Sequence, residues 1–165
     1  MHNIWIADDD EAIRMVLEEG LKSSELAITT FANGESLIEA LNEDQPDLII
    51  SDIKMPGIHG YDLLKHIKNN HEKIPVIIMT AFTDMQAAID AYGGGAFEYI
   101  PKPFDLDEAL QIVNRALEEN KLPTPKKISK SEIIGSAPSM QVVFLSIGKL
   151  ANTNATVLIQ GEFGT

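Results

Sequence analysis

The sequence predicts an α/β fold in which helices cover both faces of a parallel β-sheet. Short apolar or β-branched runs recur five times between residues 4 and 100. Between these runs, apolar residues recur at intervals of three and four, the spacing of a helix with one buried face. Strands that alternate with such helices are typical of a doubly wound sheet with right-handed crossovers.

The predicted strands are residues 4–7, 27–31, 48–52, 75–79 and 97–100. The predicted helices carry their apolar residues at Ile13, Val16, Leu17 and Leu21, at Leu37, Ile38 and Leu41, at Tyr61, Leu64 and Ile67, at Met85, Ala88, Ile89 and Tyr92, and at Leu106, Ala109, Leu110, Val113, Ala116 and Leu117. Residues 27–31 are Thr-rich and β-branched, which favours an edge strand. The flavodoxin-like strand order 2-1-3-4-5 fits this arrangement and makes the first and third strands neighbours.

The composition of the 165 residues limits the classes of function. The formal net charge of −12 disfavours nucleic-acid binding, because an acidic surface repels phosphate backbones. The absence of Cys rules out disulfides and thiolate metal ligands and fits a reducing compartment. No apolar run has the length of a membrane span, and the N-terminal residues lack the pattern of a signal peptide. We therefore expect a cytoplasmic protein without membrane association.

An acidic run, Asp8-Asp9-Asp10-Glu11, follows the first predicted strand directly. One acid suffices to cap the helix that comes next and to interact with the positive end of its dipole. Four adjacent carboxylates repel one another unless a cation lies among them. The run therefore indicates a divalent-ion site, although the sequence leaves open which acids form it.

Asp52 ends the third predicted strand, and the chain then breaks at Met55-Pro56-Gly57. In an open α/β sheet, ligands bind outside the carboxyl ends of the strands. The strand order brings Asp52 to the same place as Asp8 and Asp9. A carboxylate at this position can be a nucleophile, a metal ligand or both, whereas a lone Asp would simply cap a turn.

Two more polar residues end neighbouring strands, Thr80 after the fourth and Lys102 after the fifth. A lone Thr at a strand end is usually structural and a lone Lys is usually solvated, but Lys102 is fixed between two prolines. Together with the acids they suit phosphoryl transfer. Carboxylates hold Mg²⁺, Asp52 attacks the phosphorus, Lys102 balances charge on the phosphoryl oxygens, and Thr80 donates its hydroxyl to one of them.

These motifs resemble the receiver domain of bacterial two-component response regulators, a CheY-like fold. The resemblance covers residues 1–120 and depends on the pair Asp8-Asp9, SDIKMPG around Asp52, IIMTA around Thr80, and Lys102-Pro103. It implies that a sensor histidine kinase phosphorylates Asp52. It also implies that Mg²⁺ is bound by Asp9, Asp52 and the backbone carbonyl of Lys54, with Asp8 acting through water. Thr80 and Tyr99 would form the switch.

The residues after the receiver change character. Residues 121–132 are rich in Lys and Pro and predict a linker. Residues 133–165 contain the motif IIGSAPSMQ, then apolar residues at helical spacing, and then the motif TVLIQGEFGT. Together with the receiver, they resemble an NtrC-type activator of sigma-54 RNA polymerase. The resemblance implies a truncated start of an AAA+ ATPase domain, and a longer form that contacts sigma-54 RNA polymerase and DNA to control transcription in nitrogen regulation. The incomplete phosphate loop would be Gly161, Glu162, Phe163, Gly164 and Thr165.

The main prediction is therefore a phospho-acceptor module and not an enzyme, and a phosphorylation-dependent homodimer stays open. An aspartyl phosphatase would need a second acid near the nucleophile, but Lys54 stands two residues after Asp52. A flavin carrier would need a Ser/Thr-rich loop after the first strand, where four acids would repel the flavin phosphate. A P-loop ATPase would need the Lys that this loop lacks.

Overall fold

The structure is a computed structural model, and it describes residues 2–23, 25–81, 94–119 and 158. The chain divides into two units, Met1–Thr124 and Pro125–Thr165, and the described strands and helices all belong to the first. The predicted fourth helix, the linker at 121–132 and the incomplete phosphate loop at 161–165 lie outside the described residues. The boundaries at 120 and 132 therefore stay predictions.

The first unit contains a five-stranded parallel sheet in the order β2-β1-β3-β4-β5, which confirms the predicted strand order. The strands are β1 His2–Ala7, β2 Leu26–Phe31, β3 Leu48–Asp52, β4 Val76–Ala81 and β5 Glu98–Lys102. The described helices are α1 Glu11–Leu21, α2 Gly34–Leu41, α3 Gly60–Asn70 and α5 Leu106–Glu119. β1 and β3 are direct neighbours, with Ala7 opposite Ser51.

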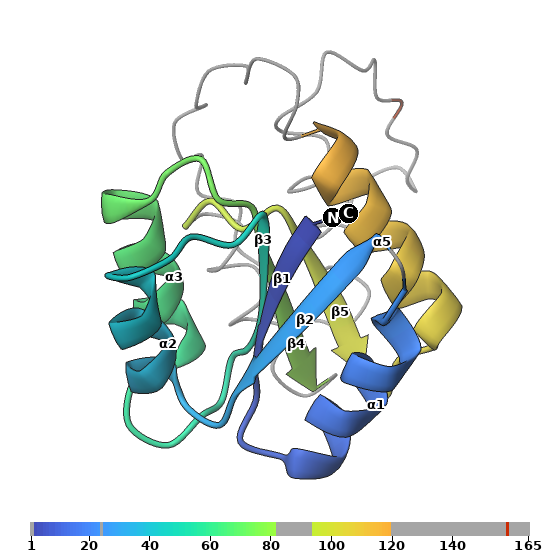
Figure 1. Cartoon of the computed structure of the whole chain (residues 1–165), viewed down its shortest axis with the longest axis horizontal. Coiled ribbons are helices and arrows are strands. Elements are labelled where there is room, and N and C mark those ends of the chain that lie inside the picture. Colours follow the sequence, from blue (N-terminus) through green and yellow to red (C-terminus); the bar gives the residue numbers. More distant parts are fainter. Residues whose placement is uncertain (1, 24, 82–93, 120–157, 159–165) are drawn as a thin grey trace, which may run out of the picture. The chain divides into compact units, whose positions relative to one another are not determined.

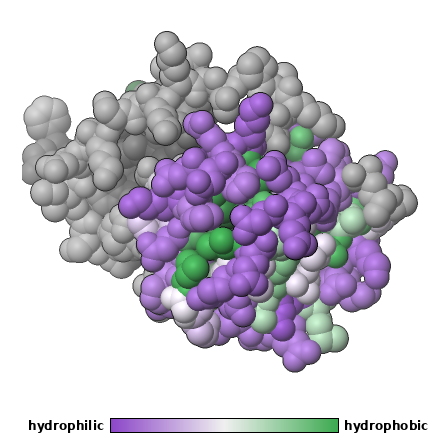
Figure 2. Space-filling model, turned by 60° about the vertical axis from the view of Figure 1, so that its left-hand side comes forward, coloured by the Kyte–Doolittle hydropathy of each residue, from purple (hydrophilic) through white to green (hydrophobic). Residues whose placement is uncertain are grey.

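Each face of the sheet has its own apolar core, because every central strand is apolar on both sides. Helices α1 and α5 pack on one face, where the core includes Ile4, Ile50 and Val113. Helices α2 and α3 pack on the other face, where the core includes Trp5 and Leu63 (Figure 1). The outward surface on the α2 and α3 side is mostly hydrophilic, as expected for amphipathic helices (Figure 2).

The last two strands extend beyond their predicted ends. β4 continues through Thr80 to Ala81, and β5 continues through Pro101 to Lys102. Pro101 lies opposite Thr80 in the ladder. Proline is tolerated there because β5 is an edge strand of the described sheet, so one side of its backbone needs no partner strand. Within the described part of the chain, no helix is long and apolar enough to cross a membrane.

Lys68 folds back over the carboxyl end of α3 and ties the following loop to it. Its Nζ atom donates to the carbonyl of Ile74 at 2.7 Å and to that of Glu72 at 3.4 Å. Burial lowers the pKa of Lys68 from 10.5 to about 8, against the opposing effect of the Glu72 carboxylate. The charged amine is therefore less stable in the folded protein than in the unfolded chain.

This lowered pKa predicts that the free energy of unfolding rises with pH through the alkaline range. Between the folded and unfolded pKa values of Lys68, the unfolded chain binds a proton that the folded protein does not. Relative to Lys68→Met, we expect the native chain to gain about 1 kcal/mol between pH about 8 and about 10, after discounting for solvent screening. Urea titrations at several pH values, followed by the fluorescence of Trp5, would measure this change in the free energy of unfolding. Lys65→Met, at an exposed position of α3, keeps Lys68 and should show the same pH dependence as the native chain. Equal slopes for Lys65→Met and Lys68→Met would contradict the assignment.

Candidate functional site

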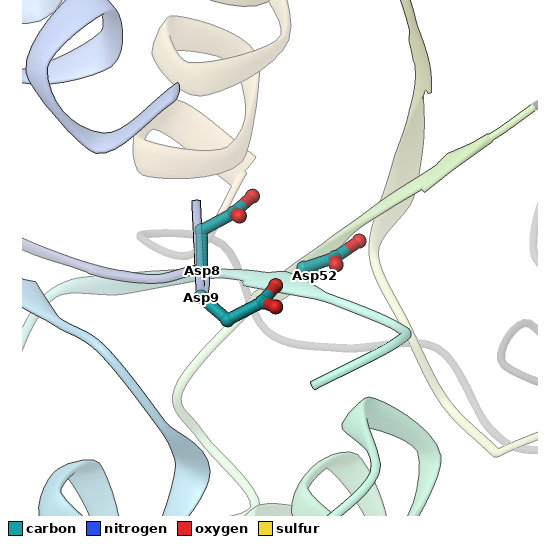
Figure 3. A group of neighbouring side chains, drawn as sticks. All are labelled: Asp8, Asp9 and Asp52. Atoms are coloured by element: carbon teal, nitrogen blue, oxygen red, sulfur yellow. The ribbon is translucent and has the colours of Figure 1, made fainter. Parts of the chain in front are cut away.

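The site lies where β1 and β3 end. Asp8 directly follows β1 and Asp52 is the last residue of β3, so the pairing of these strands places both residues at one edge of the sheet. One carboxylate oxygen from each of Asp8, Asp9 and Asp52 lies within 4.8 Å of the others. Figure 3 shows the three side chains close together at the two strand ends, extending toward the same side. This is the predicted carboxylate cluster.

The adjacent acids have different roles in the structure. Asp10 is the N-cap of α1, and its carboxylate accepts a hydrogen bond from the amide of Ala12 at 2.8 Å. The Asp8 side chain is fully buried and accepts from the amide of Asp10 at 2.9 Å, while Arg14 donates to the Asp8 carbonyl at 2.6 Å. Asp9 is exposed at the mouth of the cluster. Asp8 and Asp9 thus join the cluster with Asp52, whereas Asp10 caps the helix.

Lys102 brings a cation into this cluster from the end of β5. Its Nζ atom lies 2.7 Å from Oδ2 of Asp8 and 3.1 Å from Oδ1 of Asp52. The peptide bond that follows Lys102 is cis. By forming two ion pairs at once, Lys102 ties together the ends of three strands.

The pKa values of Asp52 and Lys102 are shifted by burial and by the contacts between these residues and Asp8. Burial raises the pKa of the Asp52 carboxyl above its ordinary value, Lys102 opposes this, and the nearby Asp8 carboxylate raises it further. Burial by itself would lower the pKa of Lys102, but the hydrogen bond to Asp8 and the charge of Asp52 outweigh it and raise that pKa. Lys102 therefore stays charged and helps to keep Asp52 ionised.

The donor set fits a hard divalent cation. Three carboxylates face one ammonium group, so the cluster keeps an excess of negative charge. Mg²⁺ prefers oxygen ligands and is commonly bound through one or two carboxylates while it keeps several waters. The exposure of Asp9 leaves the cluster open on one side, where those waters have room.

Three further predicted site residues lie on β4, on β5 and in the loop after β3. Thr80 is buried in β4, next to β3, and its hydroxyl donates to the carbonyl of Ala81 at 3.2 Å. Lys54 follows β3 in the loop that leads to α3, and its side chain is exposed. Tyr99 is half-buried in β5, where burial and then the charges of Glu98 and Glu108 raise the pKa of its phenol. Thr80 and Tyr99 therefore belong to adjacent strands.

Two residues that contact the segment after Asp52 were not identified from the sequence. Gly60, the first residue of α3, lies so close to β3 that a Cβ there would be 2.7 Å from Cα of Ile53. Glu35, in the first turn of α2, accepts a hydrogen bond from the amide of Ile58 at 3.0 Å. A glycine at a helix start and a Glu in a first turn are common, so neither carries a signal that points to the site.

Comparisons with known proteins agree with this geometry. A family model described as "Response regulator receiver domain" matches residues 4–114. The transcriptional regulator NtrC of Escherichia coli (strain K12) is 49% identical over 98% of this chain, and NtrC of Klebsiella pneumoniae is equally similar. The chain spans only 36% and 35% of the lengths of these two relatives.

Solved structures show the same fold. The solution structure of the apo receiver domain of nitrogen regulatory protein C is 50% identical, with a TM-score of 0.67, and the match covers 73% of this chain and 97% of that domain. NtrX from Brucella abortus is 31% identical with a TM-score of 0.70 over 73% of this chain and 28% of its own. The carboxylate cluster, the lysine at the end of β5 and these matches lead to one conclusion: this chain belongs to the response regulator receiver domain family.

Proposed function

We propose that this chain is a phospho-acceptor module in which Asp52 takes a phosphoryl group from the phosphohistidine of a sensor kinase. The observation that carries the proposal is the position of Asp52, whose carboxylate lies at a strand end among two further carboxylates and an ammonium group. A nucleophilic carboxylate needs nearby positive charge to accept an anionic group, and Lys102 supplies part of it.

In the proposed reaction, one carboxylate oxygen of Asp52 forms a bond to phosphorus while the bond from phosphorus to the donor's imidazole nitrogen breaks. The electron pair of that bond stays on the imidazole, and the product is an acyl phosphate on Asp52. Lys102 then contacts the new phosphoryl oxygens. Mg²⁺, held by Asp9, Asp52 and the Lys54 carbonyl with Asp8 acting through water, would supply charge neutralisation.

The same proposal includes a response to phosphorylation. The Thr80 hydroxyl would turn from the Ala81 carbonyl to a phosphoryl oxygen, and Tyr99 on the adjacent strand would change position in turn. Similarity to NtrC suggests that a longer form acts in the cytoplasm and regulates nitrogen-responsive transcription with sigma-54 RNA polymerase and DNA. Phosphorylation-dependent dimerisation is part of the proposal. Signalling, not turnover of a metabolite, is the role we assign to residues 1–120.

Intact-mass analysis after incubation with acetyl phosphate and Mg²⁺ tests the acceptor directly. We expect one labile phosphoryl adduct on the native chain, because acetyl phosphate presents a phosphoryl group with a good leaving group. The adduct should be absent from Asp52→Asn, whose amide is not a nucleophile, and should not form when Mg²⁺ is chelated before the donor is added. Asp62→Asn, at an exposed position of α3, is the matched control and should be modified like the native chain.

A phosphoryl adduct that still forms on Asp52→Asn would show that another residue is the acceptor. A native chain that is folded by circular dichroism but takes up no phosphoryl group would overturn the proposal.

A further inference from the structure

The loop between β3 and α3, residues 53–59, is held at both ends by backbone hydrogen bonds. At its start, the amide of Ile53 donates to the carbonyl of Met79 at 3.0 Å. At its close, the amide of Gly60 donates to the carbonyl of Ile53, also at 3.0 Å. The apolar side chains of Ile53 and Met55 are buried on either side of Lys54. What remains to be positioned is the outer part of the loop, Pro56 to Ile58.

Glu35 reaches across from α2 and holds that outer part. Its Oε1 atom accepts a hydrogen bond from the amide of Ile58 at 3.0 Å. Its carboxylate also covers Gly57, where a Cβ would lie 2.9 Å from Cδ of Glu35. Gly57 has a φ of +80°, so glycine is favoured there both by its backbone conformation and by the space that Glu35 occupies.

Glu35 is placed for this contact by the cap of its own helix. Asn33 is the N-cap of α2, and its side chain accepts from the amide of Ser36 at 2.9 Å while the Ser36 hydroxyl donates back to the Asn33 carbonyl at 3.1 Å. Because Asn33 and Ser36 make these two capping hydrogen bonds with each other, the Glu35 carboxylate is available for the contact with the loop. Gly34 allows a close approach to the loop, since a Cβ on it would be 3.3 Å from the Ile58 carbonyl.

We propose that Glu35 is a positioning residue for the phosphorylation site, acting through the loop that follows Asp52. By fixing Gly57 and Ile58, it holds the loop in which Lys54 presents its backbone carbonyl to Mg²⁺. This inference rests on the proposed function, because the role of the Lys54 carbonyl belongs to it. The contact is a charge-assisted hydrogen bond at the surface, so its loss should have a moderate effect.

The first test compares Mg²⁺ binding by Glu35→Ala, Glu35→Gln and Glu39→Ala, measured by isothermal titration calorimetry on the full chain. We expect Glu35→Ala to raise the dissociation constant for Mg²⁺ about three- to tenfold, the range that the net contribution of one hydrogen bond allows. Glu35→Gln keeps an acceptor oxygen and should restore most of the affinity. Glu39→Ala removes the same charge from another exposed position of α2 and should leave the affinity unchanged.

The second readout is independent of the metal. Amide hydrogen exchange of Ile58 without Mg²⁺ should become faster in Glu35→Ala, while exchange of Leu63 inside α3 should stay the same. A positioning role also predicts that the Mg²⁺ concentration for half-maximal phosphorylation rises in Glu35→Ala, whereas the rate at saturating Mg²⁺ changes little. A merely structural role would lower the amount of folded protein and would not shift that concentration.

The outcomes separate this inference from the proposed function. Equal Mg²⁺ affinity in Glu35→Ala and Glu39→Ala, with normal Asp52 phosphorylation in the native chain, would overturn the inference alone. If the native chain takes up no phosphoryl group but Glu35→Ala still weakens Mg²⁺ binding, the proposed function fails and the positioning of the loop stands. Slower Ile58 exchange in Glu35→Ala would also contradict the inference.

Discussion

Gly60→Ala is expected to destabilise the domain by about 3 kcal/mol, the upper part of the usual range for overpacking. The new methyl group would lie 2.7 Å from Cα of Ile53 and 3.0 Å from the carbonyl carbon of Asp52. Both are backbone atoms of the segment that carries the phospho-acceptor, so they can move only by displacing the end of β3. We therefore expect phosphorylation of Asp52 to slow even in the fraction of the protein that remains folded.

Urea denaturation followed by Trp5 fluorescence measures the change in stability, because Trp5 is the single Trp of the chain and is buried against Phe31. The matched control is Gly20→Ala in α1. There the new Cβ would be 2.7 Å from Cδ2 of Leu106, the far end of a flexible side chain that can turn away. Alanine is also favoured over glycine by about 1 kcal/mol inside a helix, so the net change at Gly20 should be small. Equal losses at both positions would contradict this account of Gly60.

Lys102→Met is expected to lower the free energy of unfolding by about 2 to 3 kcal/mol in the absence of divalent ions. The variant keeps the length of the side chain but removes the ammonium group that pairs with Asp8 and Asp52. The Asp8 side chain is fully buried, so its carboxylate would face two other carboxylates without the ammonium group that pairs with it. Mg²⁺ can supply that positive charge, and it should therefore stabilise the variant more than it stabilises the native chain.

Thermal unfolding of both proteins with and without Mg²⁺ checks this second prediction. Lys65→Met, which removes a charge from an exposed position of α3, serves as the control and should behave like the native chain. An unchanged stability of Lys102→Met without Mg²⁺ would show that the two ion pairs contribute nothing net to folding. Equal stabilisation of all three proteins by Mg²⁺ would show that the ammonium group and the metal do not share the cluster.

The fold and the centre of the site could be predicted from the sequence because their signals are local. Apolar runs marked the strands, and Asp52 and Lys102 each stand at the end of one. The parallel order then placed them together without any knowledge of side-chain contacts. The predicted ends of β4 and β5 come too early because the apolar runs stop before Thr80 and because a proline such as Pro101 usually ends a strand. Pairing between the two strands overrides that local preference.

The roles of Glu35 and Gly60 could not be predicted, because each depends on distances between separate segments, and that of Asp10 could not, because four adjacent acids compete for one local cap. The sequence showed a run of acids but not which carboxylate would turn toward the amide of Ala12. The contact of Glu35 with Ile58 joins residues that are 23 positions apart, and no spacing rule links them. The crowding at Gly60 depends on the path of the backbone through the preceding loop.

The ion pair between Lys102 and Asp8 joins residues 94 positions apart in the sequence. A contact of such high sequence separation can form only after the intervening chain has folded back and β5 has reached the ends of β1 and β3. Until β5 has docked on β4, the cluster at the ends of β1 and β3 lacks its ammonium group and its carboxylates repel one another. The site therefore has its full set of charges only when the sheet is complete. A chain in which β5 has not paired with β4 is not yet competent for phosphorylation of Asp52.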